Sequence, residues 1–398
     1  MYVKEDRIAL CVVCGNRPLL PWWKSLIPLP CPICLNNRNF QISTGVNPVI
    51  RETETKEGIR RIQALKKRFS EKLLILTHHY QRKEIVDLGD YRGDSFGLSQ
   101  TAADQKACQF IVFCGVHFMA ESAEILSQPH QTVQIPAMEA GCWMADMADS
   151  PAVENAWKAL TQITGSGGVM PLVYMNSDAS LKAFCGRNGG AICTSSNAAA
   201  AFKWGLQSRD KVFFLPDRHL GQNSADQLGL PPEEIILWDP QKPLGGNSPE
   251  DIRRARVILW NGYCLVHTRF QVEHVHKIRE DCPEAKIVVH PECTRQVVAM
   301  ADAVGSTSFI VQYVKEASPG ATIVIGTEIN LVHRLALEHP DKRILELHYS
   351  LCPNMFRINL KNLLWTLEHI GEVNVVRVPE EIKKEAKTAL DRMLALNT

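Results

Sequence analysis

The sequence predicts an α/β fold built on parallel sheets, and three observations carry this prediction. From about residue 57 onward, short apolar runs alternate with longer segments of helical patterning. The apolar runs are continuous, as in strands that are buried on both faces of a parallel sheet. Polar residues that can bind ligands or take part in catalysis follow directly after these runs, and ligands bind at this position in sheets of this kind.

The elements follow one another in a regular order. A linker rich in Ser, Thr, Asn, Gly and Pro is predicted at 41–56, and a helix at roughly 57–69. The helix is predicted from apolar residues near helical spacing, namely Ile59, Ile62, Leu65 and Phe69. Strands are predicted at 72–78, 109–115, 132–138, 169–176, 191–195, 211–217, 234–239, 256–262, 285–292, 321–328 and 343–348. No internal sequence repeat is strong enough to prove symmetry.

Length and composition describe an ordinary globular protein. The 398 residues are 45% apolar and 22% charged, which excludes a largely disordered chain. Lys and Arg number 44 and Asp and Glu 43, which argues against a main role in neutralising nucleic-acid phosphates. No apolar run reaches the ~20 residues of a membrane-spanning helix, and the N-terminus lacks signal-peptide features. We therefore expect a cytoplasmic protein that binds neither nucleic acid nor membrane.

Thirteen cysteines are many for a reducing compartment, and four of them form two Cys-x-x-Cys pairs near the N-terminus. These four are Cys11, Cys14, Cys31 and Cys34. Their spacing nearly matches that of a zinc ribbon, in which two such pairs close a tetrahedral sulfur site. We predict a small four-cysteine metal-knuckle extension over residues 1–50, with zinc as the favoured ion and a rubredoxin-like iron as an alternative. A metal-free extension with reactive thiols is the other alternative.

Two loops, at 93–95 and 194–197, precede helical segments and carry hydroxyl residues. The N-terminus of a helix binds anions because its free N–H groups and its dipole point at the ligand. Ser95 and Ser195 are therefore candidate anion ligands. Simple N-capping of the helices is the alternative, since the same residue types cap well.

Acid/base chemistry is suggested at two strand ends. His290 and Glu292 are separated by one residue in the predicted strand 285–292. Alternate residues of a strand face the same side, so both can enter one pocket and exchange protons. A structural hydrogen-bonded pair is the alternative. Tyr80 follows two histidines and is another acid/base candidate, with an amphipathic rim residue as its alternative.

Three cysteines of the body share a context. Cys142, Cys264 and Cys352 each lie in a loop with small or turn-forming neighbours, outside any Cys-x-x-Cys motif. Three such thiolates can meet if three subdomains converge, and ordinary buried cysteine is the alternative. The remaining cysteines are expected to be structural or to line a pocket wall, namely Cys108, Cys114, Cys185, Cys193, Cys282 and Cys293.

The chain from roughly 57 to 395 resembles quinolinate synthase, the iron–sulfur enzyme family of NAD biosynthesis. Ten segments in family order carry the resemblance: LTHHYQRKEIVDLGDYRGDS, VFCGVHFMAESAEIL, QIPAMEAGCWMADM, VYMNSDASLKAFCGRNGGAICTSSNA, FLPDRHLGQN, WNGYCLVH, IVVHPEC, VGSTSFI, GTEINLVHRLA and CPNM. The N-terminal four-cysteine segment lies outside the resemblance.

The resemblance implies a body at 57–395 of three similar α/β/α subdomains around a pseudo-threefold axis, with the active site at their junction. The implied subdomains are approximately 57–155 with 370–395, 156–260 and 261–369. The resemblance also implies a 4Fe-4S cluster held by one cysteine from each subdomain. By local motif these are Cys142, Cys264 and Cys352, with the fourth iron open to substrate.

The implied reaction condenses iminoaspartate with dihydroxyacetone phosphate to quinolinate, with release of phosphate and water. The implied catalytic residues are Tyr80, His290 and Glu292. The implied substrate-binding residues are His78, Ser95, Tyr174, Asn176, Ser195, His290, Glu292 and Thr307. His267, in a Cys-x-x-His after the second ligand, is a further candidate. An aspartate oxidase or dehydrogenase is the expected source of iminoaspartate.

Two other functions remain open from the sequence. One is a zinc-dependent lyase or aldolase that acts on a triose phosphate through His, Glu and Cys ligands. The other is a non-enzyme, in which the N-terminal knuckle binds nucleic acid or a partner. The intact polar strand ends and the near-zero net charge argue against the second.

Overall fold

The computed structural model describes residues 48–165 and 167–396, with side chains from residue 54 onward. The four cysteines of the predicted N-terminal metal site lie outside these residues. Thr55–Thr398 forms one compact unit. Across the described residues, no helix is both long enough and apolar enough to cross a membrane.

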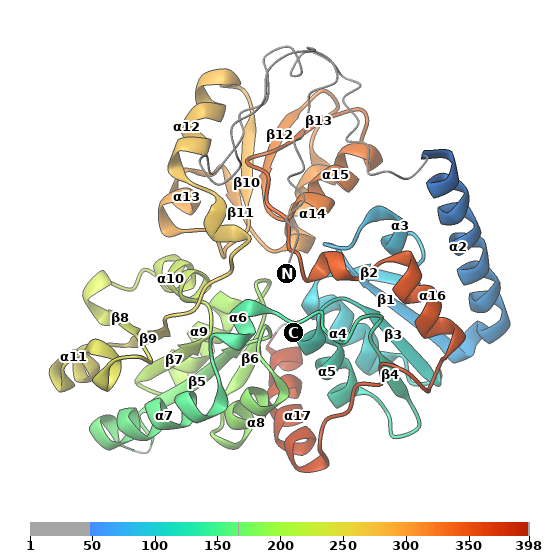
Figure 1. Cartoon of the computed structure of the whole chain (residues 1–398). Coiled ribbons are helices and arrows are strands. Elements are labelled where there is room, and N and C mark those ends of the chain that lie inside the picture. Colours follow the sequence, from blue (N-terminus) through green and yellow to red (C-terminus); the bar gives the residue numbers. More distant parts are fainter. Residues whose placement is uncertain (1–47, 166, 397–398) are drawn as a thin grey trace, which may run out of the picture. The chain divides into compact units, whose positions relative to one another are not determined.

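The first sheet contains four parallel strands in the order β2-β1-β3-β4 (Figure 1). Its central strand β1 is buried at all six positions, as its continuous apolar sequence predicts. The strands are β1 (Leu73–His78), β2 (Tyr91–Gly93), β3 (Phe110–Cys114) and β4 (Thr132–Gln134). The helices of this part are α2 (Pro48–Phe69), α3 (Lys83–Val86), α4 (Ser95–Asp104), α5 (His117–Leu126) and α6 (Trp143–Asp146), with a 3-10 turn at Ser70–Lys72.

The second sheet contains five parallel strands in the order β6-β5-β7-β9-β8. Its strands are β5 (Val169–Tyr174), β6 (Ala191–Cys193), β7 (Lys211–Leu215), β8 (Ile235–Trp238) and β9 (Val257–Trp260). Its helices are α7 (Ser150–Thr164), α8 (Ala179–Arg187), α9 (Ala198–Ser208), α10 (Arg218–Gln227) and α11 (Pro249–Arg254), with 3-10 turns at Pro232–Glu234 and Pro243–Gly246. Phe213 is fully buried and contacts the rings of Trp157, Trp238 and Trp260.

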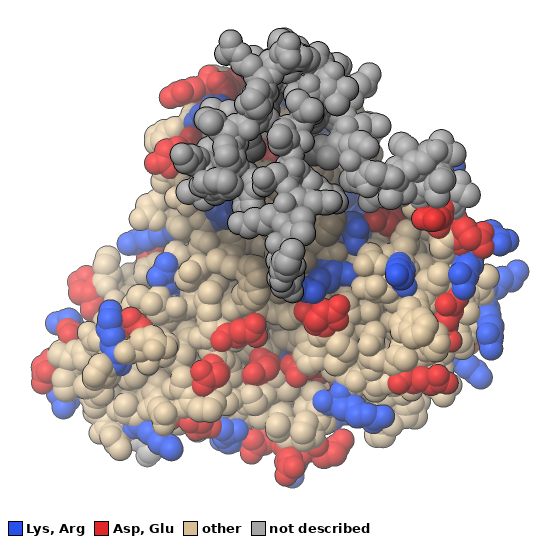
Figure 2. Space-filling model, in the orientation of Figure 1, with Lys and Arg blue, Asp and Glu red and all other residues tan. Residues whose placement is uncertain are grey.

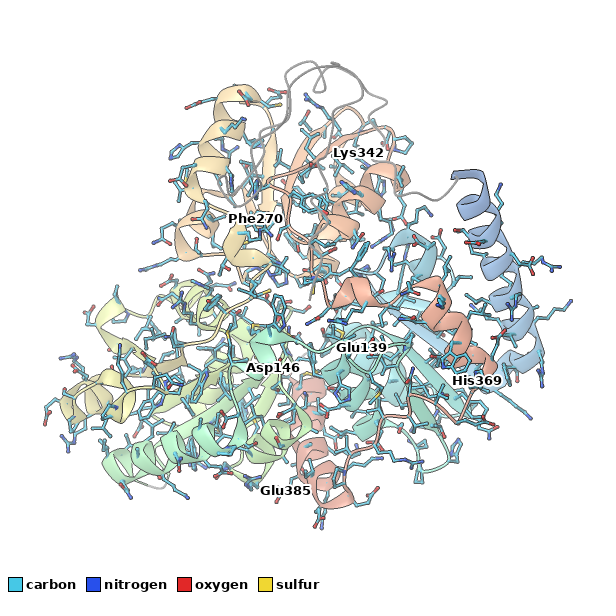
Figure 3. All side chains as sticks on the ribbon, viewed as in Figure 1. Glu139, Asp146, Phe270, Lys342, His369 and Glu385 are labelled. Carbon is cyan, nitrogen blue, oxygen red and sulfur yellow. The ribbon has the colours of Figure 1, made fainter. Side chains whose placement is uncertain are left out.

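The third sheet contains four parallel strands in the order β11-β10-β12-β13. Its strands are β10 (Lys286–Val289), β11 (Ala303–Val304), β12 (Thr322–Gly326) and β13 (Arg343–Glu346). Its helices are α12 (Val272–Asp281), α13 (Arg295–Met300), α14 (Thr307–Glu316) and α15 (Ile329–Glu338), with 3-10 turns at His267–Arg269 and Met355–Arg357. Phe270 is fully buried in a core that belongs to this sheet (Figure 3).

The three sheets repeat one topology. In each, the first strand lies between the second and the third, as in β2-β1-β3, β6-β5-β7 and β11-β10-β12. The chain is therefore α/β with three similar subdomains, as predicted. The strand order shows a structural repeat that no sequence repeat revealed. Buried strands can use different apolar residues of similar size, so similar subdomains need not share sequence.

The C-terminal elements are α16 (Leu360–Glu368) and α17 (Glu380–Ala395). Helix α17 packs against α8 and β6 of the second sheet and against α5 of the first. The α8–α17 approach requires glycine, because a methyl group at Gly186 would collide with the carbonyl group of Glu385. The subdomain boundaries expected from the resemblance stay predictions.

The surface of the described part carries both signs of charge. Figure 2 shows Lys and Arg interspersed with Asp and Glu over the visible face, as the near-zero net charge suggests. Many of these groups form ion pairs between exposed side chains, such as Lys83 with Asp87. Pairs of this kind contribute little to stability because water and salt screen them.

Every predicted strand is present, but three local expectations were wrong. Strand β4 stops at Gln134 rather than 138, since Pro136 has no N–H to donate to a ladder. The polar stretch HHYQRKEIVDLGDYRGDS at 78–95, whose composition is loop-like, contains α3 and the short edge strand β2. Helix α2 begins at Pro48, so the predicted linker is helical from that residue, where the fixed φ of proline suits a helix start.

Candidate active site

One cavity of about 690 Å³ opens at the carboxyl ends of the central strands of all three sheets. Parallel strands present their following loops at one edge, so side chains far apart in sequence meet there. Every candidate site residue of the body lines this cavity. They are His78, Tyr80, Ser95, Cys142, Tyr174, Asn176, Ser195, Cys264, His290, Glu292, Thr307 and Cys352.

The first sheet contributes His78, which ends β1, and Tyr80, which follows it. The Tyr80 backbone N–H donates to Nδ1 of His78 at 3.1 Å. Burial lowers the pKa of His78 to about 4, so the ring is neutral at physiological pH. A neutral imidazole with Nδ1 as acceptor carries its proton on Nε2. His78 is therefore a hydrogen-bond donor to whatever occupies the cavity.

The third sheet contributes a second neutral histidine. Burial lowers the pKa of His290, just after β10, to about 3. Its Nδ1 accepts from the backbone N–H of Glu292 at 3.4 Å, which leaves the proton on Nε2. Its ring stacks on His267, with ring centroids 4.3 Å apart. The two strand-end histidines thus have the same tautomer and the same donor character.

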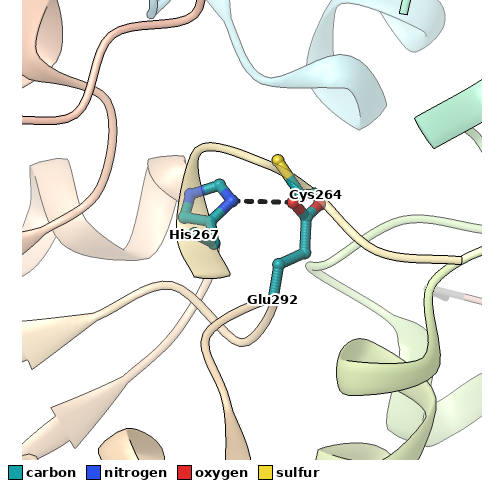
Figure 4. A group of neighbouring side chains, drawn as sticks. All are labelled: Cys264, His267 and Glu292. Carbon is teal, nitrogen blue, oxygen red and sulfur yellow. Dashed lines mark hydrogen bonds and ion pairs between the residues drawn. The ribbon is translucent and has the colours of Figure 1, made fainter. Parts of the chain in front are cut away.

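Glu292 is the centre of a buried hydrogen-bond network. Its Oε1 accepts from the hydroxyl of Tyr174 at 2.5 Å, and its Oε2 lies 2.7 Å from Nδ1 of His267 (Figure 4). Burial alone would raise the pKa of Glu292, but the neighbouring imidazoles of His267 and His290 and the hydrogen bonds from His267 and Tyr174 hold it below its ordinary value. Glu292 is therefore a carboxylate, and His267 donates to it through Nδ1–H.

The network extends from His267 to Tyr80. Nε2 of His267 lies 3.1 Å from the hydroxyl of Thr327 and 3.4 Å from that of Tyr80. The hydroxyls of Tyr80 and Thr327 are 2.6 Å apart. Burial and the nearby charge of Glu292 raise the pKa of Tyr80 well above its ordinary value, so its hydroxyl keeps its proton. A continuous path for protons runs from Tyr80 through Thr327 and His267 to Glu292.

Three cysteine thiols converge on the same cavity. Cys142 precedes α6, Cys264 follows β9 and Cys352 follows β13, so each comes from a different sheet. All three are free thiols that are partly exposed to the cavity. Burial raises the pKa of each, to about 12 for Cys142 and about 11 for Cys352. The thiol of Cys352 adds to the effect at Cys142, and the thiol of Cys142 adds to it at Cys264.

These thiols fit an iron–sulfur cluster by the chemistry of their donor set. Three thiolates in one partly buried place repel one another, so a cationic centre is needed to hold them together. Soft sulfur donors select iron–sulfur clusters, copper(I) or zinc. Three protein ligands leave one position of a cubane cluster without a protein donor.

A second set of donors overlaps with the first. Ligand atoms of Cys264, His267 and Glu292 lie within 4.8 Å of one another (Figure 4). Both ring nitrogens of His267 and both carboxylate oxygens of Glu292 already have hydrogen-bond partners. A metal ion bound here would have to displace these hydrogen bonds, whereas the three thiols of the cysteine set remain available.

Three helices begin at the cavity wall. Ser95 is the first residue of α4, Ser195 lies three residues before the start of α9, and Thr307 is the first residue of α14. The capping alternative holds for the loop 93–95, where Asp94 accepts from the N–H of Gly97, but not for the loop 194–197, since the N-cap of α9, Asn197, makes no side-chain cap. Helix α14 is capped by Ser306, which accepts from the N–H of Phe309. The remaining N–H groups of these helix starts give the cavity a positive field suited to phosphate or carboxylate groups.

Sequence reasoning left three members of this site without a role. His267 was only a further candidate, and Thr327, in the predicted strand 321–328, and Asp94, in the loop 93–95, received no role. Their shared signal is position at the carboxyl end of a strand or the start of a helix. Position alone does not show which distant residue each one contacts.

The chain has clear relatives among known proteins. Residues 60–395 match the family model described as Quinolinate synthetase A protein. The quinolinate synthase of Geobacillus thermodenitrificans is 49% identical over 342 residues, which cover 84% of this chain and 92% of that protein. The quinolinate synthases of Bacillus velezensis and Rhodopirellula baltica are 46% and 45% identical, over 87% of this chain and 95% and 92% of theirs. The chain belongs to the quinolinate synthase family.

Proposed function

We propose that this enzyme condenses iminoaspartate with dihydroxyacetone phosphate to form quinolinate, with release of phosphate and water. One observation carries the proposal: the thiols, the helix starts and the acid/base residues that the family resemblance singles out all line one cavity. This reaction needs an anion cradle, hydrogen-bond donors to carboxylates and a route for protons. Each requirement has a matching group in the cavity.

The anion cradle serves the phosphate of the triose and the carboxylates of iminoaspartate. Ser95, Ser195 and Thr307 supply hydroxyl groups at or beside the three helix starts. Asn176, on the loop after β5, adds an amide that can donate to a carboxylate oxygen. His78 and His290 can donate hydrogen bonds from Nε2–H to substrate oxygens. Because both rings are neutral, they add no positive charge that would attract all anions without selectivity.

The proton path serves the enolisation and dehydration steps of the reaction. Tyr80 keeps its proton at neutral pH and donates it from Oη as a general acid. A proton taken from the substrate in the enolisation step passes through Tyr80 and Thr327 to Nε2 of His267, where Glu292 stabilises the imidazolium. The same path returns this proton to Tyr80 after Tyr80 has donated to the departing hydroxyl. Tyr174 fixes the second oxygen of Glu292. Burial of the network keeps competing water away from these protons.

We assign Cys142, Cys264 and Cys352 as ligands of a 4Fe-4S cluster. When bound, such a cluster supplies an open iron that acts as a Lewis acid toward a carboxylate or a departing hydroxyl. The need for three reduced thiols supports a reducing, cytoplasmic setting for the reaction. An aspartate oxidase or dehydrogenase is the class of enzyme that would supply iminoaspartate.

Metal analysis and product detection test this proposal together. Anaerobically purified chain should contain about four irons with matching sulfide in the body. With iminoaspartate and dihydroxyacetone phosphate it should form quinolinate. Zinc bound at the N-terminal cysteines would appear as about one additional zinc per chain.

A zinc-dependent lyase that acts on a triose phosphate is the second candidate, and the Cys264, His267 and Glu292 set favours it. Under this alternative the body would hold about one zinc and no iron. Deleting residues 1–50 separates zinc at the two places. Loss of all zinc with retained quinolinate synthesis supports the cluster enzyme, whereas retained zinc and no quinolinate supports the lyase.

A further inference from the structure

Three helices from three subdomains begin around the same wall of the cavity. These are α4 from the first, α9 from the second and α14 from the third. An anion can be shared by the three only if their starts are held at fixed separations. Each start belongs to a different sheet, so a contact across the subdomain boundaries has to set these separations.

Asp94 makes such contacts. It lies at the start of α4 and is only 6% exposed. Its Oδ1 accepts from the N–H of Gly97 at 2.9 Å and so caps its own helix. Its Oδ2 accepts from the hydroxyl of Ser196 at 2.9 Å, just before α9. Ser308, on α14, also acts on this carboxylate and lowers its pKa.

Asp94 is charged in this position. Burial alone would raise its pKa, but the hydrogen bonds from Gly97, Ser308 and Ser196 bring the pKa below its ordinary value. Hydrogen bonds to a charged acceptor are roughly twice as strong as neutral ones. The carboxylate therefore holds hydroxyls from the second and third subdomains more firmly than an amide or a hydroxyl would.

The contacts of Asp94 lie beside the anion cradle. Asp94 precedes Ser95 and its partner Ser196 follows Ser195, and both Ser95 and Ser195 line the cavity. A shift of Ser196 relative to Asp94 would thus separate two of the three hydroxyl groups that face the substrate. The capping function of Asp94 needs only Oδ1, so the bond from Ser196 to Oδ2 serves another purpose.

We propose that Asp94 is a positioning residue that links the starts of α4 and α9, and with them α14, so that Ser95, Ser195 and Thr307 converge on one anionic group of the substrate. This inference rests on the proposed function, since that anionic group is the phosphate or a carboxylate of the substrates. Asp94 acts through Ser196 and Ser308. It is not itself a ligand of the substrate.

A double-mutant cycle tests the link. Asp94→Ser keeps an effective N-cap but is too short to reach Ser196. Ser196→Ala removes the other partner and leaves the Thr194–Asn197 bonds at the start of α9 in place. Each single change should raise KM for dihydroxyacetone phosphate about tenfold, with kcat changed less. The double variant should be no worse than Asp94→Ser alone, because that change already removes the bond from Ser196.

Asp149→Ser is the matched control. Asp149 caps α7 by accepting from the N–H of Ala152, and it is exposed and does not line the cavity. This variant should lower thermal stability slightly and leave KM unchanged. Iron and sulfide content should be equal in all variants, which excludes an effect through the thiols.

Binding of inorganic phosphate provides a second readout that does not need turnover. The affinity for phosphate, from calorimetry or from thermal shift, should fall in Asp94→Ser and Ser196→Ala with the same lack of additivity. The role of Asp94 is refuted if the effects of Asp94→Ser and Ser196→Ala multiply in the double variant, or if the KM of Asp94→Ser equals that of Asp149→Ser.

The proposed function has a separate outcome. If the wild-type chain binds phosphate but forms no quinolinate, the proposed function alone is refuted, and the phosphate affinities of the variants then decide the role of Asp94. Chain that does neither overturns both.

Discussion

Nδ1 of His267 lies 2.7 Å from Oε2 of Glu292, and both side chains are almost completely buried. The two residues are 25 positions apart in sequence, on the loop after β9 and at the end of β10. Their contact connects the acid/base pair expected at 290–292 to Tyr80 on the first sheet. Through this contact, Glu292, His267 and Tyr80 belong to one hydrogen-bond network.

Glu292→Gln should lower kcat by about 10² to 10⁴-fold, the usual contribution of an acid/base residue. The amide can no longer balance a charge on His267, and its N–H group would face the N–H of the imidazole. Iron and sulfide content should stay at the wild-type level, because Glu292 is not assigned as a ligand. Steady-state kinetics with metal analysis checks this, and Glu233→Gln, at an exposed position, is the control. Equal kcat in the two variants would remove Glu292 from the proton path.

Tyr80→Phe should lower kcat by about 10²-fold or more, with little change in KM. The ring and its edge contact with His78, at a centroid distance of 4.8 Å, are retained. Only the hydroxyl that meets Thr327 is lost. Tyr91→Phe, in an exposed edge strand, should behave like the wild type. A large rise in KM with unchanged kcat would instead make Tyr80 a binding residue.

Replacing any one of Cys142, Cys264 and Cys352 with Ser should remove most of the iron and sulfide and abolish quinolinate formation. Each thiol comes from a different subdomain, so neighbouring cysteines cannot replace it without moving a sheet. Visible absorption and iron analysis after anaerobic reconstitution measure the effect. Cys108→Ser, outside the cavity, should keep its cluster. A Cys264→Ser chain with a full cluster would refute the ligand assignment.

Lys182 on α8 should make stability depend on pH in the alkaline range. Burial lowers its pKa to about 8, although Glu121 and Asp178 act in the opposite direction. Between this value and the ordinary lysine pKa, the unfolded chain binds more protons than the folded one. Stability therefore rises with pH in this window, by up to about 1.4 kcal/mol per pH unit.

The measurement compares the Tm of wild type and Lys182→Met at about pH 7.5 and about pH 9.5, on either side of the shifted pKa. The Tm of the wild type should increase relative to the Tm of Lys182→Met as the pH rises. Lys387→Met, whose ammonium is half exposed and pairs with Asp391, should show no such trend. A constant difference between wild type and Lys182→Met would mean that Lys182 does not titrate in this range.

The sequence was a good guide to elements and to the chemical types of the site residues. Strand-end position pointed to His290 and Glu292, and the family resemblance added His78 and Tyr174, all of which line the cavity. The sequence did not reveal the two edge strands β2 and β11, because short edge strands need little apolar sequence. The role of Thr327 was also missed, since a threonine after a strand is common in any α/β protein.

The sequence by itself determined the α/β class, the spacing of the N-terminal cysteines and, through the family resemblance, which residues belong to the site. Only the tertiary structure decided that three sheets share one strand order and that Cys142, Cys264 and Cys352 meet in one cavity. It also decided that Asp94 contacts Ser196 and that His267 contacts Glu292. The physical reason is that local patterns record what each segment buries, whereas these contacts join segments whose separation in sequence carries no information about their distance in space.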